Sequence, residues 1–539
     1  MRRVRSLAGV ILALSVGAAW VGQPTPATRA PVLEALIDNL RAEGTLEIKG
    51  RTIYADPVVL AVYERRSYEP LWSDVDLDAL LRAVHSTSTD GIDPDIYHET
   101  LLTGLSILPL GPELSAELDL LATDAFVRLS RDLRYGRVPQ VESDVPGPKL
   151  GPFGSPDPPG EILRVVASGL LEQRVAELRP SHFEYDRLVR GLVELRAIER
   201  RGGWEPIPTG PTMLRDSADA RIPLLRHRLI LTGDYRQEGQ GASDPDPMSF
   251  DRALETAVRH FQHRHGLNED GRVGGATLAS LNVPVEGRIE QVRVNLERAR
   301  RAERDLPAEY VSVNVPGARV YMSRGSTVEF ETRAVVGEEE TQTPTFDALM
   351  SYIELNPTWT VPRGMVEELL EAVLDDPRYL SDRQMHVLNS KGVAVDPTTL
   401  DFTAFTPETF PYVFHQEPGP LNPLGRIKLI FPNEYAIYLH DSPARWAFAE
   451  EERLFSHGCV RVEDPVGLAM AVLHEPDTWD REALEDAIAE GETLAIPLTQ
   501  PLRVYIVYRT VEADRAGTLH FYEDVYDRDP AVLALLDRR

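Results

Sequence analysis

The spacing of apolar residues changes along this chain of 539 residues, and the change limits the folds that are open to it. Up to about residue 205, apolar residues recur at the spacing of an amphipathic helix, as at Leu33, Ile37 and Leu40. From about residue 309, short runs alternate between apolar and polar residues, which is typical of strands. A domain has about 150 residues, so this length allows three or four domains. We therefore expect a multi-domain α+β protein.

Changes in pattern also suggest where the domains lie. Residues 31–205 hold no catalytic grouping, and we interpret them as a helical scaffold domain. Residues 211–285 are expected to form a small domain of three helices, with turns at the glycines near position 271. Residues 309–515 are expected to be β-rich, with a helical and irregular capping insertion over 363–425. A C-terminal segment, 516–539, follows.

The composition excludes two classes of protein. Lys and Arg total 57 and Asp and Glu total 85, which gives a net charge of −28. Nucleic-acid binders and polybasic membrane-surface proteins need the opposite excess, because they neutralise phosphate or anionic lipid. We expect no nucleic-acid partner.

The first residues have the pattern of a secretory signal. A basic start is followed by an apolar run from Leu7 to Val21 and then by Gln23–Pro26. The run has 15 residues, whereas a helix that crosses a bilayer needs about 20. We assign 1–22 to a signal peptide and expect export. Contact with the membrane would then come only through a signal that is not cleaved.

Cys459 is the single cysteine of the chain, so it cannot form an intramolecular disulfide or a multi-cysteine zinc site. Exported proteins usually pair their cysteines, so an unpaired one is either buried and inert or a reactive thiol. Its neighbours favour the second interpretation. His457 and Arg461 flank it at −2 and +2, and His440 ends a strand-like run 19 positions earlier.

These neighbours fit nucleophilic chemistry, because only the thiolate attacks and a nearby imidazole or guanidinium favours it. Gly458 would let the backbone approach closely and point N–H groups at a developing oxyanion. A zinc site made of His440, His457 and Cys459 is the alternative. It lacks ligand spacing on a rigid element, and an arginine beside the metal would repel it. We expect no metal.

Several motifs together resemble those of the L,D-transpeptidase family. They are S-H-G-C-x-R at 456–461 with His440 before it, N-x-L-G-x-I-K at 422–428, and N-P-x-W at 356–359. The pattern of 258–282, V-x-x-F-Q followed by G-L and D-G-x-V-G, resembles a three-helix peptidoglycan-binding domain. The order of the parts is similar to the large Gram-negative branch of the family, which has a scaffold domain, a peptidoglycan-binding-like domain and a catalytic domain with a capping insertion.

The resemblance implies a mechanism and a location. Cys459 would attack the carbonyl of the third residue, a meso-diamino acid, in a donor tetrapeptide stem, and D-Ala would leave. The side-chain amine of an acceptor stem would resolve the thioester and form a 3→3 cross-link. His440 would act as general base and acid, while His457, Gly458 and the backbone of Cys459 would shape the oxyanion site. No cofactor would be needed. The protein would work in the periplasm on peptidoglycan stem peptides, with other cell-wall synthesis enzymes as possible partners.

Five further residues are candidates for substrate binding, and each has a structural alternative. Arg461 could hold the loop or bind a carboxylate. The others could equally be core, cleft wall or hydrogen-bonding groups of the fold; they are Ser456, Tyr435, Trp359 and Asn356.

The acceptor stays open at this point. Water would make the protein a carboxypeptidase, a protein lysine would make it an attachment enzyme, and a D-amino acid would make it an exchange enzyme. A non-catalytic wall-binding scaffold is the alternative from another class.

Overall fold

The computed structural model describes residues 26–138, 152–235, 246–302, 304 and 306–538. The predicted signal peptide, 1–22, lies outside these residues. The chain divides into two compact units. The first comprises Met1–Ser86, Pro94–Ser130 and Gly151–Val175, and the second comprises the rest, including everything from Ala176 onward. No helix of the described residues is both long and apolar enough to cross a membrane.

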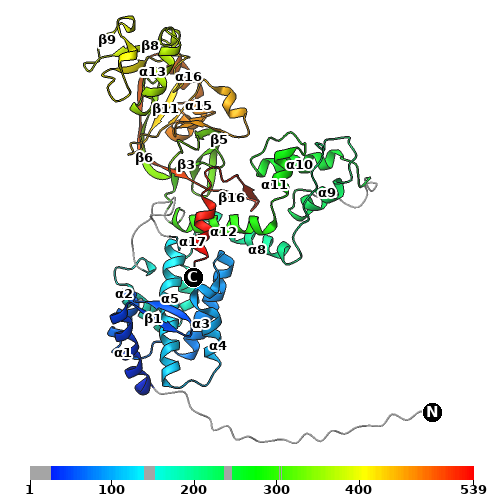
Figure 1. Ribbon diagram of the computed structural model, residues 1–539, viewed down its shortest axis with the longest axis vertical. Helices are drawn as coiled ribbons and strands as arrows, with labels where there is room; N and C mark the ends of the chain where they lie inside the picture. The colour runs from blue at the N-terminus through cyan, green and yellow to red at the C-terminus, as the bar shows by residue number, and fades with distance from the viewer. Residues whose placement is uncertain (1–25, 139–151, 236–245, 303, 305, 539) are drawn as a thin grey trace, which may run out of the picture. The chain divides into compact units, whose positions relative to one another are not determined.

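The first unit is largely helical, and Figure 1 draws its helices in blue and cyan. The aspartate Asp119 is buried in the long helix α5, where it accepts N–H groups from Leu71 and Trp72 and the hydroxyl of Tyr63 at 2.8 Å. A hairpin of strands β1 and β2, which the sequence pattern did not reveal, lies among the helices. The elements are α1 Pro26–Glu43, β1 Thr45–Ile48, β2 Arg51–Tyr54, α2 Pro57–Arg65, α3 Asp74–Ser86, α4 Glu99–Ser106, α5 Pro112–Tyr135, α6 Pro158–Ala167 and α7 Leu171–Ala176.

The second unit begins with helices. The predicted three-helix group consists of α9, α10 and α11, with its own apolar core. The buried side chain of Gln262 holds the turn between α10 and α11. Its amide donates to Asp270 at 2.8 Å and its oxygen accepts the N–H of Gly271 at 2.8 Å. These elements are α8 Phe183–Glu199, α9 Ile222–Leu231, α10 Arg252–Arg264, α11 Gly275–Leu281 and α12 Val285–Ala302.

The β-rich part contains a nine-stranded sheet with the order β13-β5-β14-β12-β11-β6-β15-β3-β4. Because β4 also pairs with β5, the sheet closes on itself and β13 remains as an extra strand against β5. Its apolar residues form the largest core of this part together with helix α15. The strands are β3 Glu309–Asn314, β4 Arg319–Arg324, β5 Thr327–Gly337, β6 Phe346–Leu355, β11 Ile427–Ile430, β12 Leu439–His440, β13 Leu454–Ser456, β14 Val460–Val462 and β15 Leu494–Val507.

Two helices, α15 and α16, also belong to this part. In α15, Pro465–Leu473, the side chain of Asp464 accepts the N–H of Gly467 at 3.0 Å. Helix α16, Arg481–Ala489, ends just before Gly491. After β15 the chain continues through β16 Val511–Ala513, β17 Leu519–Phe521 and α17 Asp529–Leu536. The multi-domain α+β prediction is thus confirmed.

The predicted insertion contains helices and, in addition, a small sheet. Strands β7-β10-β8-β9 form it, and a separate core of stacked phenylalanines fills the space beside helix α13. Phe410 and Phe414 stack with ring centroids 4.8 Å apart. The sheet was missed because its strands have only two to four residues. The elements are β7 Trp359–Thr360, α13 Val366–Asp375, α14 Tyr379–Asp382, β8 Met385–Leu388, β9 Ala394–Val395 and β10 Val413–Gln416.

Candidate active site

Cys459 lies in a tight turn between β13 and β14, and both of these strands pair with β5. The turn depends on Gly458, whose φ of +101° is one that residues with a side chain rarely adopt. A Cβ at this position would lie 3.2 Å from Cδ1 of Ile437. The glycine of the motif is therefore needed for both its backbone angle and its small size.

The buried hydroxyl of Ser456 holds the turn from inside. It donates to the carbonyl of Cys459 at 2.5 Å and accepts the N–H of Gly458 at 3.2 Å. The side chain that we considered for substrate binding is thus occupied within the turn. Because the Gly458 N–H is taken, it is not free to face an oxyanion, whereas the Cys459 N–H has no acceptor among the described residues.

A second set of hydrogen bonds ties the turn to the end of β5. Thr343 donates its hydroxyl to the carbonyl of Gly458 and accepts the N–H of Gly337, both at 2.9 Å. Tyr526, from the C-terminal segment, donates to the carbonyl of Gly337 at 2.6 Å and accepts the N–H of Thr343 at 3.2 Å. The position of the thiol is therefore set by residues far from it in sequence.

The thiol of Cys459 is half-buried against the core of the sheet. Its Sγ lies 3.9 Å from the carbonyl oxygen of Ala436. Burial raises the pKa of the thiol, and hydrogen bonding with Tyr438 and the positive charges of Lys428 and Arg461 act against this rise. Burial dominates, so the free thiol is protonated near neutral pH.

His440 is buried in β12, one strand away from the cysteine turn. Its Nδ1 lies 2.5 Å from the carbonyl oxygen of Asp441, which can only accept, so we assign the proton to Nδ1. Burial, followed by the charge of Arg461, lowers the pKa of His440 to about 3. The imidazole is therefore neutral, and its Nε2 carries a lone pair that can take a proton.

Four polar residues form a row across neighbouring strands. The register places Glu354 of β6 opposite Lys428 of β11, Lys428 opposite His440, and His440 opposite Arg461 of β14. Directly opposite residues project on the same face of a sheet. The alternate residues of these strands, such as Leu429, belong to the buried core. The row thus gathers charge on the face away from that core.

The side chain of His457 is directed toward the insertion. Its Nε2 lies 3.0 Å from Oε1 of Glu368 in α13, and both side chains are exposed. The imidazole is thus paired with Glu368 and not with the thiol. This contact connects the S-H-G-C-x-R motif to the insertion.

The remaining candidates fall into two groups. Arg461 is half-buried and has no ion pair among the described residues, and burial lowers the pKa of its guanidinium. Tyr435 is exposed, with its ring 5.0 Å from that of Phe346. Asn356 and Trp359 instead have structural contacts. The Asn356 amide donates to the carbonyls of Ile488 and Glu492 at 3.0 and 3.1 Å, and Trp359 packs on the core of the insertion.

Tyr438 and Lys428 have no role in the sequence-based expectations, although both side chains lie at the site. Tyr438 acts to lower the pKa of the Cys459 thiol, and its ring centroid lies 5.7 Å from that of His440. The strand-like run that ends at His440 is only partly a strand in the structure. Only Leu439 and His440 are in the ladder, because Asn433 accepts the N–H groups of Tyr435 and Ile437 and folds the preceding residues into a turn.

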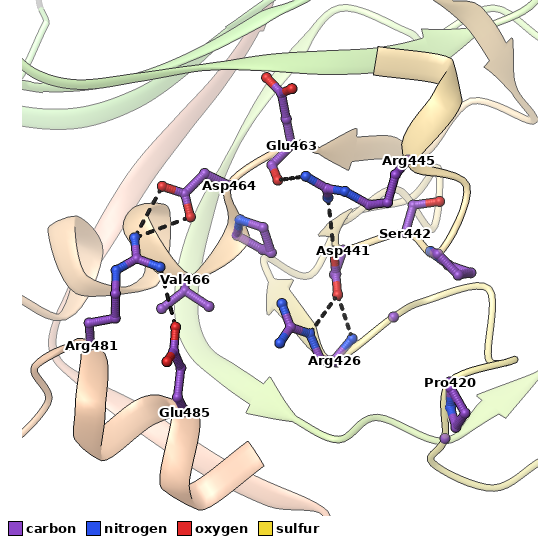
Figure 2. A pocket seen from close by; sticks show the side chains of 14 residues that line it. Pro420, Arg426, Asp441, Ser442, Arg445, Glu463, Asp464, Val466, Arg481 and Glu485 are labelled. Carbon is purple, nitrogen blue, oxygen red and sulfur yellow. Dashed lines mark hydrogen bonds and ion pairs between the residues drawn. The ribbon is translucent and has the colours of Figure 1, made fainter. Parts of the chain in front are cut away.

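A separate cavity of about 610 Å³ opens at the opposite ends of β12 and β14, and Cys459 does not line it. Figure 2 shows that Arg426 and Arg445 converge on the buried carboxylate of Asp441, at 3.4 and 3.6 Å. Arg481 pairs with Asp464 at 3.2 Å. The charged side chains that line this cavity are thus mostly paired with one another. No group of side chains suited to a metal ion occurs in the described part of the chain.

Family models match three segments of the chain. Residues 308–479 match the L,D-transpeptidase catalytic domain, 219–281 match a "Putative peptidoglycan binding domain", and 57–192 match a scaffold domain. Residues 308–479 therefore form a domain of the L,D-transpeptidase family.

One curated relative and two solved structures are similar to parts of the chain. A "Putative L,D-transpeptidase" of Haemophilus influenzae is 30% identical over 220 residues, which are 41% of this chain and 44% of that protein. The chain thus spans less than half of that relative's length. Crystal structures of an L,D-transpeptidase from Xylanimonas cellulosilytica and of a fused Zn-dependent amidase/peptidase and peptidoglycan-binding protein from Clostridium acetobutylicum are 17% and 12% identical. Each covers 56% of this chain and 100% of the other, with TM-scores of 0.19 and 0.15, which are too low to carry an argument.

Proposed function

We propose that this protein is a periplasmic L,D-transpeptidase that forms 3→3 cross-links between peptidoglycan stems through a thioester on Cys459. The observation that carries the proposal is the placement of the single cysteine. It sits in a glycine-dependent turn, next to strands that bear a neutral buried histidine and a cation that has no carboxylate partner among the described residues. The family of residues 308–479 supports the reaction class.

The first half-reaction begins with a neutral thiol and a neutral imidazole. The Cys459 Sγ attacks the carbonyl of the third residue of the donor stem, and its proton passes to Nε2 of His440. The C–N bond to D-Ala then breaks as the tetrahedral intermediate collapses. His440 returns the proton to the departing amine, which leaves an acyl thioester on Cys459.

The second half-reaction reverses these roles. The side-chain amine of an acceptor stem attacks the thioester carbonyl and gives a proton to His440. The C–S bond breaks, the new amide joins two third residues, and the thiolate regains the proton. Asp441 supports His440 in both steps, because its carbonyl keeps the proton on Nδ1 and Nε2 available.

The N–H of Cys459 is the amide that we assign to the oxyanion. It has no acceptor in the described parts of the chain, whereas the N–H of Gly458 bonds to Ser456. We assign Arg461 to a carboxylate of the stem, because its half-buried guanidinium has no counter-ion in the described ranges and is suited to bind one. The domain at 219–281 would hold the chain on the polymer, and export to the periplasm would place it there.

The test is incubation of the purified protein with a disaccharide-tetrapeptide, followed by liquid chromatography and mass spectrometry. The proposal predicts a 3→3 dimer with one D-Ala released per bond, and no product from Cys459→Ala. Arg461→Gln should raise KM, while Arg481→Gln, which changes an arginine of the separate cavity, should leave it unchanged. Tripeptide alone would show that water is the acceptor, and an active Cys459→Ala would overturn the assignment of the nucleophile.

A further inference from the structure

Lys428 is a half-buried cation beside the cysteine that the proposed reaction does not use. It occupies the middle of the polar row, with Glu354 on the neighbouring strand to one side and His440 on the other. No carboxylate lies within ion-pair distance of its Nζ in the described part of the chain. The ammonium instead lies 4.0 Å from the centroid of the Tyr438 ring.

The aromatic ring connects this ammonium to the thiol. The hydroxyl of Tyr438 acts to lower the pKa of the Cys459 thiol, while the face of the same ring lies against the ammonium of Lys428. A cation over an aromatic face draws electron density from the ring and makes its hydroxyl a better hydrogen-bond donor. A better donor stabilises a thiolate more than a neutral thiol.

We propose that Lys428 is a positioning residue that stabilises the Cys459 thiolate, through its own charge and through the Tyr438 hydroxyl. The inference rests on the proposed function only in taking Cys459 as the nucleophile. Four other groups face this part of the site: Glu354 from β6, His440 from β12, Arg461 from β14 and Glu338 after β5. Glu354 and Glu338 oppose the effect of Lys428 and Arg461 on the thiolate. The imidazole of His440 is neutral.

A simpler alternative is that the aliphatic part of Lys428 merely packs on Tyr438. The two interpretations differ in their dependence on charge. Lys428→Met keeps an unbranched apolar chain and removes the ammonium, whereas Lys428→Arg keeps a cation over the ring. A packing role would be retained by Met, and an electrostatic role would be retained by Arg.

The experiment measures the second-order rate of Cys459 alkylation by iodoacetamide as a function of pH, in the full chain. In this reaction an S–C bond forms, iodide leaves, and the thiol proton has gone to solvent. We expect Lys428→Met to move the midpoint of the profile up by about one pH unit, with the limiting rate at high pH unchanged. Below both midpoints this is about a tenfold slower reaction.

Lys428→Arg should restore most of the wild-type midpoint, and Lys391→Met, at an exposed lysine of the insertion, should leave it unchanged. If Lys428→Met does not fold, Lys428→Gln takes its place. A midpoint that stays the same in Lys428→Met would overturn the inference, as would an equal shift in Lys428→Arg. If the wild type makes no cross-links while its alkylation still responds to Lys428, the proposed function fails and this inference stands.

Discussion

Thr343 gives the sharpest test of how the cysteine turn is held, because its buried hydroxyl is the link between that turn and β5. It donates to the carbonyl of Gly458 and accepts from the N–H of Gly337, each at 2.9 Å. Thr343→Val keeps the shape of the side chain and removes both bonds. Two buried backbone groups then lose a partner.

The expected loss can be worked from these two bonds. A buried backbone group that loses its partner costs about 1–3 kcal/mol, so with two such groups the local structure should become about 2–6 kcal/mol easier to open. Since about 1.4 kcal/mol corresponds to a factor of ten, amide exchange in the peptides that contain Gly337 and Gly458 should accelerate at least about 30-fold. Hydrogen–deuterium exchange with mass spectrometry measures this directly.

Thr341→Val is the matched control two residues away. Its hydroxyl is half-buried and makes one bond, to the carbonyl of Ser456 at 3.1 Å. We expect a loss of about 0.5–1 kcal/mol, which is less than about a sixfold change in exchange. If the two variants accelerate exchange equally, or if Thr343→Val changes it less than about threefold, Thr343 does not hold the turn.

Three further predictions concern the same domain. Gly458→Ala should lower stability by about 1–3 kcal/mol in pulse proteolysis, because φ is +101°; an unchanged midpoint would refute the strain. Asn356→Ala should cost about 2–3 kcal/mol in the same assay, since it removes amide bonds to two carbonyls at the end of α16, whereas Tyr435→Ala should be nearly neutral. His440, with its pKa lowered to about 3, should contribute stability that is complete above about pH 6.5 and is lost as the pH falls toward 3, because the unfolded state takes up the proton first. His440→Gln should therefore make the urea midpoint depend less on pH between about pH 4 and 7. Equal slopes in the wild type and the variant would contradict this.

The parts of the site that were predictable from sequence are those written in one short stretch. The residues from Ser456 to Arg461 include the proposed nucleophile, its glycine and its charged neighbour. His440 stood out because it ends an apolar run. Local chemistry of this kind needs no knowledge of the fold.

The rest depends on strand pairing, which a single sequence does not display. Lys428 reaches the site because β11 pairs with β12 in one particular register. Tyr526 comes from the C-terminal segment, where nothing in its neighbours points to the cysteine turn. Asn356 is a candidate for substrate binding in the sequence, and in the structure its amide donates to a carbonyl at the end of α16. Sequence alone cannot tell a motif residue that builds the fold from one that faces the substrate.

The central claim is that Cys459 accepts an acyl group, and intact mass spectrometry tests it most directly. The purified protein is incubated with a carbapenem, whose β-lactam carbonyl acylates a reactive thiol, in parallel with Cys459→Ala. We predict one adduct on the wild type and none on the variant. No adduct on a folded wild type with a thiol that is alkylated only after denaturation, or an adduct on Cys459→Ala, would contradict the claim.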